Sequence, residues 1–450
     1  MIHRLHRVAP VLLFWGVAVL LAGCSAPVRD STVRPRHPEE DPRLAALAPS
    51  PHDELWIWEK PGREPPQRDA RRGPALLARE SADGGFVSLP LRHTDVEASI
   101  SGPIAAVELR QQYENPLGKP AEAVYVMPLP QDAAVTDFVM TIGRRRIRGI
   151  VRHRSEARRI YDEARARGYA ATLLSQERGD YFMQRLANLE PGQRIDLSIK
   201  YFHTLTWSNG RLVWGLELPV ARTDKSTTRP TGASLSVAID VDRTVPLESV
   251  DSPHHKMRQE RTARGTRLEF DSGGAGVDRD FAVYLRLADE DRPASALLGQ
   301  ADGRGGGHFL MVCGLPIEWS RGVITDLEMD FGAAKVSEVV PERLDARRPV
   351  SPVVVVGRCS GKLPEKVVLR GRMDGKPWQV EVFASPTTRG PASAAIAPLW
   401  ARRRINALCE PPSSEEAVKR ITALALEFGL PSAHTAMVSV DATHRVGGVP

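Results

Sequence analysis

Apolar and polar residues alternate along much of the chain from residue 85 onward, with the period of two that is typical of half-buried β-strands. In the stretch 107–113, Val107, Leu109 and Tyr113 alternate with charged or amide side chains. Turn residues such as Asn115-Pro116-Leu117-Gly118 separate such runs. Similar runs predict further strands at 123–127, 135–142, 147–152 and 194–202. Short strands separated by turns predict an antiparallel β-sandwich.

One helix interrupts these strands. Ser155 is a suitable N-cap, and Gly168 can end the helix in a left-handed conformation. Between them, one apolar stripe is formed by Ala157, Ile160, Tyr161 and Ala164. The polar side carries a basic run, Arg158, Arg159, Arg165 and Arg167, which is either an anion-binding surface or a solvated helix face. A solvated face is the interpretation we favour, because Glu163 and Arg167 form a favourable i,i+4 pair.

The second half of the chain repeats the strand pattern and then turns helical. Nine further strands are predicted at 233–241, 266–271, 280–287, 308–313, 323–331, 335–340, 350–356, 366–372 and 377–384. They suggest a second β-sandwich over 231–385. The segment 386–450 predicts two helices and a final strand at 436–441, with Ser413 and Glu416 as a capping box. The chain is therefore expected to be mainly β with some α, its C-terminal helices packed on a preceding sheet.

The N-terminus predicts a targeting segment. Basic residues precede an apolar run from Val8 to Leu21, which is short for a membrane-spanning helix. The run ends in Leu21-Ala22-Gly23-Cys24, which resembles the bacterial lipobox. We therefore expect cleavage between Gly23 and Cys24 and lipidation of Cys24, which would anchor the chain to a membrane of the cell envelope. Ser25 favours the outer membrane, and the alternatives are an uncleaved anchor or an ordinary signal peptide.

Residues 24–84 predict a flexible tether. This stretch is rich in Pro, Arg, Asp and Glu and poor in apolar residues, so it buries too little surface to fold alone. Such a tether would span roughly 40–45 Å. The exception is Leu55-Trp56-Ile57-Trp58, which could form a short strand or a docking element.

Composition narrows the classes of function. The 450 residues are 42% hydrophobic and 26% charged, which excludes a wholly disordered chain and a polytopic membrane protein. The net charge of +6 is spread along the chain, which disfavours nucleic-acid binding. Apart from Cys24, the cysteines Cys313, Cys359 and Cys409 form no CxxC pair, so we expect free buried thiols, no metal site and no cofactor.

A family resemblance becomes specific between residues 129 and 192. The motifs that carry it, in order, are Leu129-Pro130, Ala133-Ala134-Val135, Gly143, Ile147, Gly149, Ala157-Arg158, Tyr161-Asp162-Glu163-Ala164, Gly168-Tyr169-Ala170-Ala171-Thr172-Leu173-Leu174 and Ala187-Asn188-Leu189-Glu190-Pro191-Gly192. Together they resemble the vault protein and inter-alpha-trypsin (VIT) module, which we place at 85–222. The resemblance implies a β-rich interaction scaffold without a catalytic role.

Relatives of this layout carry a von Willebrand A domain whose Asp-x-Ser-x-Ser motif holds Mg²⁺, and no such motif is found in this sequence. Asp271-Ser272-Gly273-Gly274 lacks the second Ser. We expect that Pro316–Gly322 is a short loop at the place where that domain is missing, and that the flanking strands form one sandwich.

Four motifs are candidates for a catalytic, phosphate-binding or metal-binding site. Gly357-Arg358-Cys359-Ser360-Gly361 resembles a nucleophile elbow but is followed by a strand, so we interpret it as a hairpin turn. Gly303-Arg304-Gly305-Gly306-Gly307 opens no helix and is unsuited to a phosphate. His254-His255 predicts a surface loop, and Asp326, Glu328 and Asp330 predict the wet face of a strand.

These observations favour a non-enzymatic, lipid-anchored envelope protein that contacts an unknown protein partner and has no small-molecule substrate. The alternatives are a cysteine-dependent hydrolase centred on Cys359 and a divalent-metal-dependent adhesin.

Overall fold

The computed structural model describes residues 73–79, 86–143, 145–178, 181–208, 211–218, 220–222, 228–230, 233–243, 247–277, 279–287, 295–314, 324–344, 352–385, 394–409 and 414–445. The predicted signal sequence with Gly23 and Cys24, the segment Leu55–Trp58 and the loop Pro316–Gly322 lie outside these residues. All described elements belong to one compact unit, residues 59–450. No helix within the described ranges is long and apolar enough to cross a membrane.

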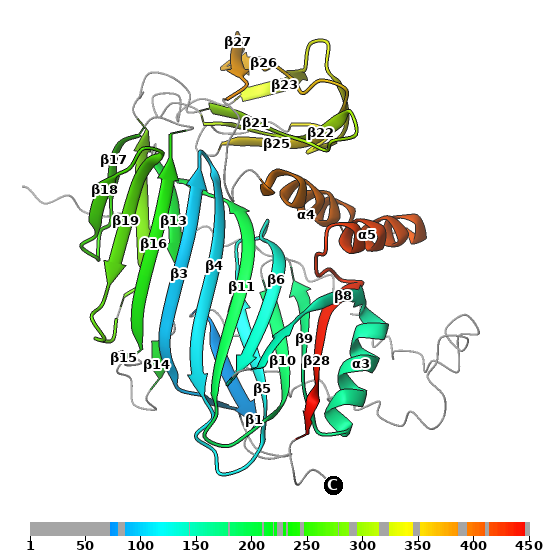
Figure 1. Ribbon diagram of the computed structural model, residues 1–450. Coiled ribbons are helices and arrows are strands. Elements are labelled where there is room, and N and C mark those ends of the chain that lie inside the picture. The colour runs from blue at the N-terminus through cyan, green and yellow to red at the C-terminus, as the bar shows by residue number, and fades with distance from the viewer. Residues whose placement is uncertain are drawn as a thin grey trace, which may run out of the picture. The chain divides into compact units, whose positions relative to one another are not determined.

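Two large sheets form the main body (Figure 1). The seven-stranded sheet has the order β2 (Phe86–Ser88), β1 (Ala75–Arg79), β5 (Ala121–Pro128), β10 (Tyr181–Leu189), β9 (Tyr169–Arg178), β28 (Thr435–Arg445) and β8 (Ile150–His153). The eight-stranded sheet has the order β18 (Arg258–Arg261), β19 (Gly265–Asp271), β16 (Ser234–Asp242), β3 (Leu91–Ser101), β4 (Ile104–Glu114), β11 (Arg194–Thr204), β6 (Ala134–Ile142) and β7 (Arg145–Arg148). Neighbouring strands are antiparallel except β16 and β3.

The two sheets share one core, which is formed by the side chains that each sheet turns toward the other. Tyr125 and Phe182 from the seven-stranded sheet lie in the same cluster as Leu109 and Leu197 from the eight-stranded sheet. A smaller four-stranded sheet adds Trp214 to this cluster. Its order is β12 (Thr206–Ser208), β13 (Arg211–Leu216), β20 (Phe281–Leu287) and β17 (Leu247–Asp251), and β14 (Val220–Arg222) pairs with β15 (Thr228–Pro230).

Two further sheets pack face to face into a small sandwich. One has the order β21 (Ser295–Ala301), β22 (Gly306–Cys313), β25 (Val353–Ser360) and β24 (Lys335–Val340), and the other β23 (Ile324–Asp330), β26 (Lys366–Met373) and β27 (Lys376–Phe383). Cys313 and Ile324, which flank the predicted loop, lie in one buried cluster. The strands on both sides of that loop therefore share a core, as the sequence predicted.

Three helices are described, of which α3 and α4 cover sheet faces (Figure 1). Helix α3 (Arg154–Ala166) packs on β28 and β9. Helix α4 (Ile396–Leu408) lies between the small sandwich and the main body, because its buried cluster joins Leu310 of β22 to Ala134 of β6. Helix α5 (Glu415–Glu427) follows and packs on α4.

The observed elements correct several boundaries. Strand β1 lies inside the predicted tether 24–84, and Leu76 and Ala78 are wholly buried, so the prediction of a flexible segment is wrong for Ala75–Arg79. Strand β1 lies between β2 and β5 and pairs with both. The predicted strand 147–152 divides at Gly149, whose N–H donates to Phe138 O at 2.9 Å, and its two halves join different sheets.

The domain limits also shift. Strand β16 pairs in parallel with β3, so the predicted boundary between 222 and 231 falls within a sheet. Both helix caps differ from expectation: α3 begins after His153 rather than Ser155, and α5 is capped by Ser414, whose Oγ accepts from Ala417 N at 3.1 Å. The positive φ of Gly168, 77°, confirms the predicted end of α3.

Candidate interaction surface

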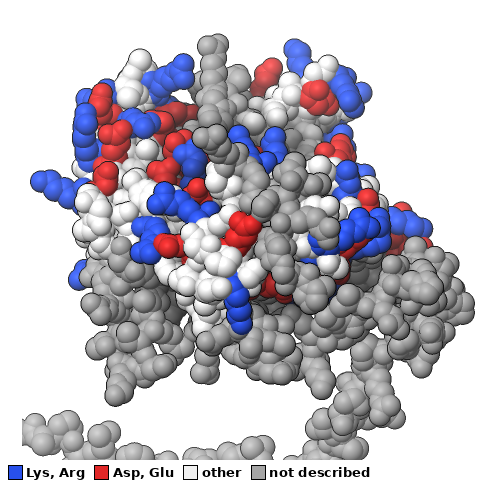
Figure 2. Space-filling view, turned by 60° about the horizontal axis from the view of Figure 1, so that its bottom comes forward, with Lys and Arg blue, Asp and Glu red and all other residues white. Residues whose placement is uncertain are grey.

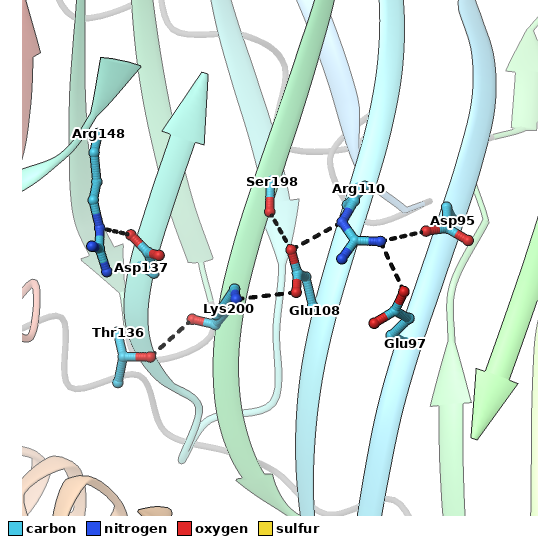
Figure 3. A network of polar contacts seen from close by, with 9 residues as sticks. All are labelled: Asp95, Glu97, Glu108, Arg110, Thr136, Asp137, Arg148, Ser198 and Lys200. Atoms are coloured by element: carbon cyan, nitrogen blue, oxygen red, sulfur yellow. Dashed lines mark hydrogen bonds and ion pairs between the residues drawn. The ribbon is translucent and has the colours of Figure 1, made fainter. Parts of the chain in front are cut away.

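The outer face of the eight-stranded sheet carries two groups of polar contacts, a larger one around Arg110 and Glu108 and a separate pair of Arg148 with Asp137 (Figure 3). Strands β3, β4 and β11 turn alternate side chains into the core and the others outward over most of their length, whereas β6 is buried on both sides except at Thr136 and Thr141. Many of the outward positions hold charged or hydroxyl side chains, and the register places them opposite one another. Polar residues that alternate along each strand therefore lie side by side across neighbouring strands. We call this group of side chains the outer-face network. Its members are Asp95, Glu97, Glu108, Arg110, Thr136, Asp137, Arg148, Ser198 and Lys200.

Arg110 is the centre of the outer-face network. Its Nη1 lies 2.9 Å from Asp95 and 3.0 Å from Glu97, and its Nε lies 2.9 Å from Glu108. Glu97 and Glu108 are direct cross-strand partners, which is unfavourable for two like charges. The shared guanidinium offsets that repulsion. Partial burial raises the pKa of Glu108, but hydrogen bonds from Arg110 and Lys200 outweigh it, so this pKa lies below its ordinary value.

The network continues across the sheet toward its β7 edge. Ser198 Oγ donates to Glu108 at 3.0 Å, and Lys200 Nζ lies 3.1 Å from the same carboxylate. At the edge, Arg148 Nε donates to Asp137 at 2.8 Å. Another view shows acidic and basic side chains intermixed over the surface (Figure 2). Such partly exposed pairs add little stability, but they give the face a fixed pattern of charge that a protein partner can match.

Cys359 is not placed as a nucleophile. It lies within β25, and the turn that begins at Gly361 leads to β26 in the other sheet of the small sandwich, so the prediction of a hairpin turn is wrong. The side chain is 6% exposed and its thiol donates to Gly307 O at 3.6 Å. Burial and the charge of Asp302 raise its pKa, which keeps the thiol protonated. His308 pairs with Arg358, the neighbour of Cys359, so the His308 and Cys359 side chains point to opposite faces of the sheet.

The other two cysteines differ from each other. Cys313 is buried, and burial raises its pKa to about 12. Cys409 is exposed, which contradicts the expectation that all three thiols are buried. It follows the last turn of α4, where its N–H donates to Ile405 O at 3.0 Å. All three are free in the structure.

Residues 302–305 connect β21 to β22, and the last two glycines of the run 303–307 belong to β22. Asp302 Oδ1 accepts from the N–H groups of Arg304 at 2.7 Å and Gly306 at 3.0 Å. These hydrogen bonds lower the pKa of the Asp302 carboxyl. Because a side chain of the protein already occupies the backbone donors, the loop is an Asx-type turn and offers them to no phosphate.

Histidine and carboxylate candidates fall on separate surfaces. His254 is exposed as predicted, but His255 is buried and stacks on Phe281 with ring centroids 5.1 Å apart, because the loop folds against the main core. Asp326 and Glu328 are exposed, and Asp330 pairs with Arg370 at 3.0 Å, as expected for a wet face. Within the described ranges, no group of three or more His, Cys, Asp or Glu residues could hold a metal ion.

The basic run on α3 is a solvated face with paired charges. Arg158 lies 3.8 Å from Asp162, and Glu163 is shared by Arg159 at 3.4 Å and Arg167 at 2.5 Å. These are i,i+4 pairs, which confirms the solvated face for Arg158, Arg159 and Arg167. Arg165 differs, because it pairs with Glu122 of β5 and its side chain is only 34% exposed.

The cluster of polar and aromatic side chains around Glu338 was not predicted from the sequence. Glu338 accepts from Arg420 at 2.5 Å and from Arg358 at 3.4 Å, while its carbonyl accepts from Trp400 Nε1 at 3.0 Å. His308 lies against the Trp400 ring, 4.7 Å between centroids. These residues come from β22, β24, β25, α4 and α5, so no local motif could have revealed them. They hold the two C-terminal helices to the small sandwich.

Residues 91–201 match the family of the vault protein inter-alpha-trypsin domain. A stretch of 227 residues, 47% of this chain, is 28% identical to protein mono-ADP-ribosyltransferase PARP4 of Mus musculus and covers 12% of it. A stretch of 124 residues, 27% of this chain, is 31% identical to von Willebrand factor A domain-containing protein 5A of Rattus norvegicus and covers 15%. A further 137-residue match, 28% of this chain, is 24% identical to inter-alpha-trypsin inhibitor heavy chain H2 of Homo sapiens and covers 14%. The chain thus spans between 12% and 15% of the length of these relatives.

Proposed function

Because residues 91–201 are a vault protein inter-alpha-trypsin domain, we propose that this chain is a non-enzymatic, lipid-anchored protein of the bacterial cell envelope that binds a protein partner. The domain and its relatives mark the chain as a protein with an interaction domain. The anchor is proposed to be a lipid on Cys24, after cleavage behind Gly23, at the outer membrane. A tether then holds the folded body near the membrane and raises its effective concentration for a partner there.

The observation that carries the binding role is the outer-face network centred on Arg110. This guanidinium serves three carboxylates, so the group formed by Arg110, Asp95, Glu97 and Glu108 has more acidic than basic members. The Glu97 side chain is 59% exposed and directly faces Glu108, a like charge. A partner that presents a basic side chain to the exposed Glu97 carboxylate would gain a charge-assisted hydrogen bond there.

The alternative of a cysteine-dependent hydrolase has less support. A catalytic cysteine needs a lowered pKa, access to solvent and an adjacent base. Cys359 is buried, has a raised pKa, and is separated from His308 by the plane of the sheet. The alternative of a metal-dependent adhesin would use the carboxylates Asp326, Glu328 and Asp330, which lie along one strand. Asp330 is already paired with Arg370, so this alternative also has less support.

A photo-crosslinking amino acid at Glu97, placed in the lipidated chain in its native membrane, tests the binding role. The matched control is Glu260 on β18, whose side chain is also 59% exposed. We expect one discrete protein adduct from position 97 and none of that size from position 260, and loss of the adduct in Arg110→Glu. Identical adducts from both positions, or none from either, would contradict the proposal. A Cys24→Ser variant should in parallel leave the membrane fraction.

A further inference from the structure

The seven-stranded sheet contains a slot that is filled by the far end of the chain (Figure 1). Strand β28 lies between β9 and β8 and is antiparallel to both, so that Met437 pairs with Leu174 on one side and with Val151 on the other. Both walls of the slot come from residues 150–178, whereas the strand that fills it begins at Thr435. The matched domain at 91–201 therefore does not complete its own sheet.

The slot selects its strand by side-chain size and polarity. Ala436 and Val438 pack against the apolar stripe of α3, including Tyr161. Met437 points the opposite way, into the main core, and is 2% exposed. Ser439 Oγ and Thr172 Oγ1 share a buried hydrogen bond at 2.5 Å. A small–large–small alternation followed by a hydroxyl is a specific pattern, so few segments other than β28 itself would fit.

The chain leading into β28 is fixed at a defined point. Arg402 on α4 is fully buried and donates to Pro431 O at 2.6 Å. A tight turn follows, in which Ser432 N donates to Thr435 O at 3.1 Å. If this turn opened into an extended segment, β28 would leave its own slot while the body behind Pro431 stayed in place. Short connections of this kind are the usual hinges of strand exchange.

From these contacts we infer that the slot between β9 and β8 also accepts β28 from a second copy of this chain, which gives a strand-exchanged dimer. Every contact made by β28 is the same within one chain and between two, so exchange mainly requires opening the 432–435 turn and bringing two copies together. Ile150 pairs with Val438 at the rim of the slot and is 55% exposed, which provides apolar surface where two bodies would meet.

The inference concerns a different surface from the outer-face network, and anchoring of both copies on one membrane would favour exchange by raising the local concentration. The test mixes two variants that each carry one introduced cysteine, Thr172→Cys and Ser439→Cys, in the lipidated chain with Cys409→Ser to remove the exposed thiol; the buried Cys313 and Cys359 remain. Because the two residues are Cα partners across the β9–β28 ladder, a disulfide between different chains reports an exchanged strand. The matched control mixes Ser439→Cys with Glu269→Cys, which lies on β19.

We expect at least five-fold more inter-chain disulfide from the Thr172→Cys and Ser439→Cys mixture than from the control mixture. Equal yields would overturn the inference, provided that the double variant crosslinks within one chain and so shows an intact slot. If the cysteine variants fail to fold, sedimentation of the detergent-solubilised unmodified chain shows whether it is a monomer or a dimer. A dimer that is lost when the 432–434 turn is lengthened by three residues supports exchange, and a monomer throughout contradicts it. Neither result depends on whether Cys24 carries a lipid, so failure of the anchor is seen separately by fractionation.

Discussion

Arg403 on helix α4 donates to the carboxylate of Asp132 in the turn between β5 and β6 at 2.8 Å, and this contact ties the C-terminal helix to the matched domain. Thr204 joins both, because its hydroxyl donates to Asp132 at 2.5 Å and accepts from Arg403 at 3.1 Å. The side chains of Arg403 and Asp132 are only 22% and 15% exposed. The contact is therefore shielded from water and salt, unlike the ion pairs of α3.

The first prediction concerns this contact. Arg403→Met should lower the free energy of unfolding by about 1.5–3 kcal/mol, because it leaves a partly buried carboxylate without its charged donor. A double-mutant cycle with Asp132→Asn, followed by urea denaturation, isolates the coupling between the two. The exposed pair Arg258 and Glu260 is the control, for which coupling below about 1 kcal/mol is expected. Equal coupling energies in both pairs would contradict the claim that the Arg403–Asp132 contact is shielded from water and salt.

The second prediction is a pH dependence that arises at His308. Burial, reinforced by the charge of Arg358, lowers the pKa of His308 to about 4, while Asp302 and Glu338 partly oppose that shift. The unfolded chain, with an ordinary histidine pKa near 6.5, therefore binds the proton more readily. The stability from neutral His308 is fully present above about pH 6.5 and is lost as the pH falls toward 4.

Thermal unfolding between pH 7 and pH 5 measures this effect. The loss assigned to His308 should be at most about 2 kcal/mol. His308→Phe keeps an aromatic ring against Trp400 and Phe428 but has no titrating group, so its stability curve should be flatter over this range. Parallel curves for the two proteins would show that the pH dependence has another source.

Thiol reactivity provides the third prediction. In the folded chain Cys409 should react with an aromatic disulfide reagent before the other two thiols, because its side chain is exposed, although partial burial raises its pKa as well. Cys313 and Cys359 should react only after denaturant is added, because both are buried with raised pKa values. Rapid modification of Cys359 in the native protein, lost in Cys359→Ala, would instead favour the hydrolase alternative.

The fourth prediction concerns the last strand. Met437→Ala should lower the free energy of unfolding by about 2–5 kcal/mol, since it leaves a cavity in the core between the two large sheets. Leu426→Ala on α5 removes a comparable side chain that is 38% exposed, so it should cost less than about 1 kcal/mol. Chemical denaturation of the two variants measures both losses in the free energy of unfolding. Similar small losses would mean that β28 is dispensable to the sheet.

Local patterns were sufficient to predict most elements and the family. Alternation at 107–113 predicted β4, and the stripe of Ala157, Tyr161 and Ala164 predicted α3. The resemblance to the inter-alpha-trypsin module is confirmed by the match at 91–201, and the mainly β fold class is confirmed by the sheets. These features depend on the period of a strand or helix or on ordered motifs, so they are visible within short windows.

What the sequence could not predict are relationships between distant segments. Nothing near Thr435 indicates that β28 enters a sheet formed by residues 75–189, since any strand with this alternation would look the same. Strand β1 was missed because Ala75–Arg79 is short and is surrounded by polar residues typical of a tether. The Glu338 cluster was missed because its members come from five elements. Tertiary pairing decided each case, and it leaves no local signal.

The central claim of a lipid-anchored body is tested most directly by mass spectrometry of the N-terminal peptide of the chain purified from its native membranes. The account predicts a mature chain that begins at Cys24 and carries a diacylglyceryl thioether and an acylated amine. A chain recovered from the soluble fraction that still contains residues 1–23, or one with an unmodified Cys24, would contradict it.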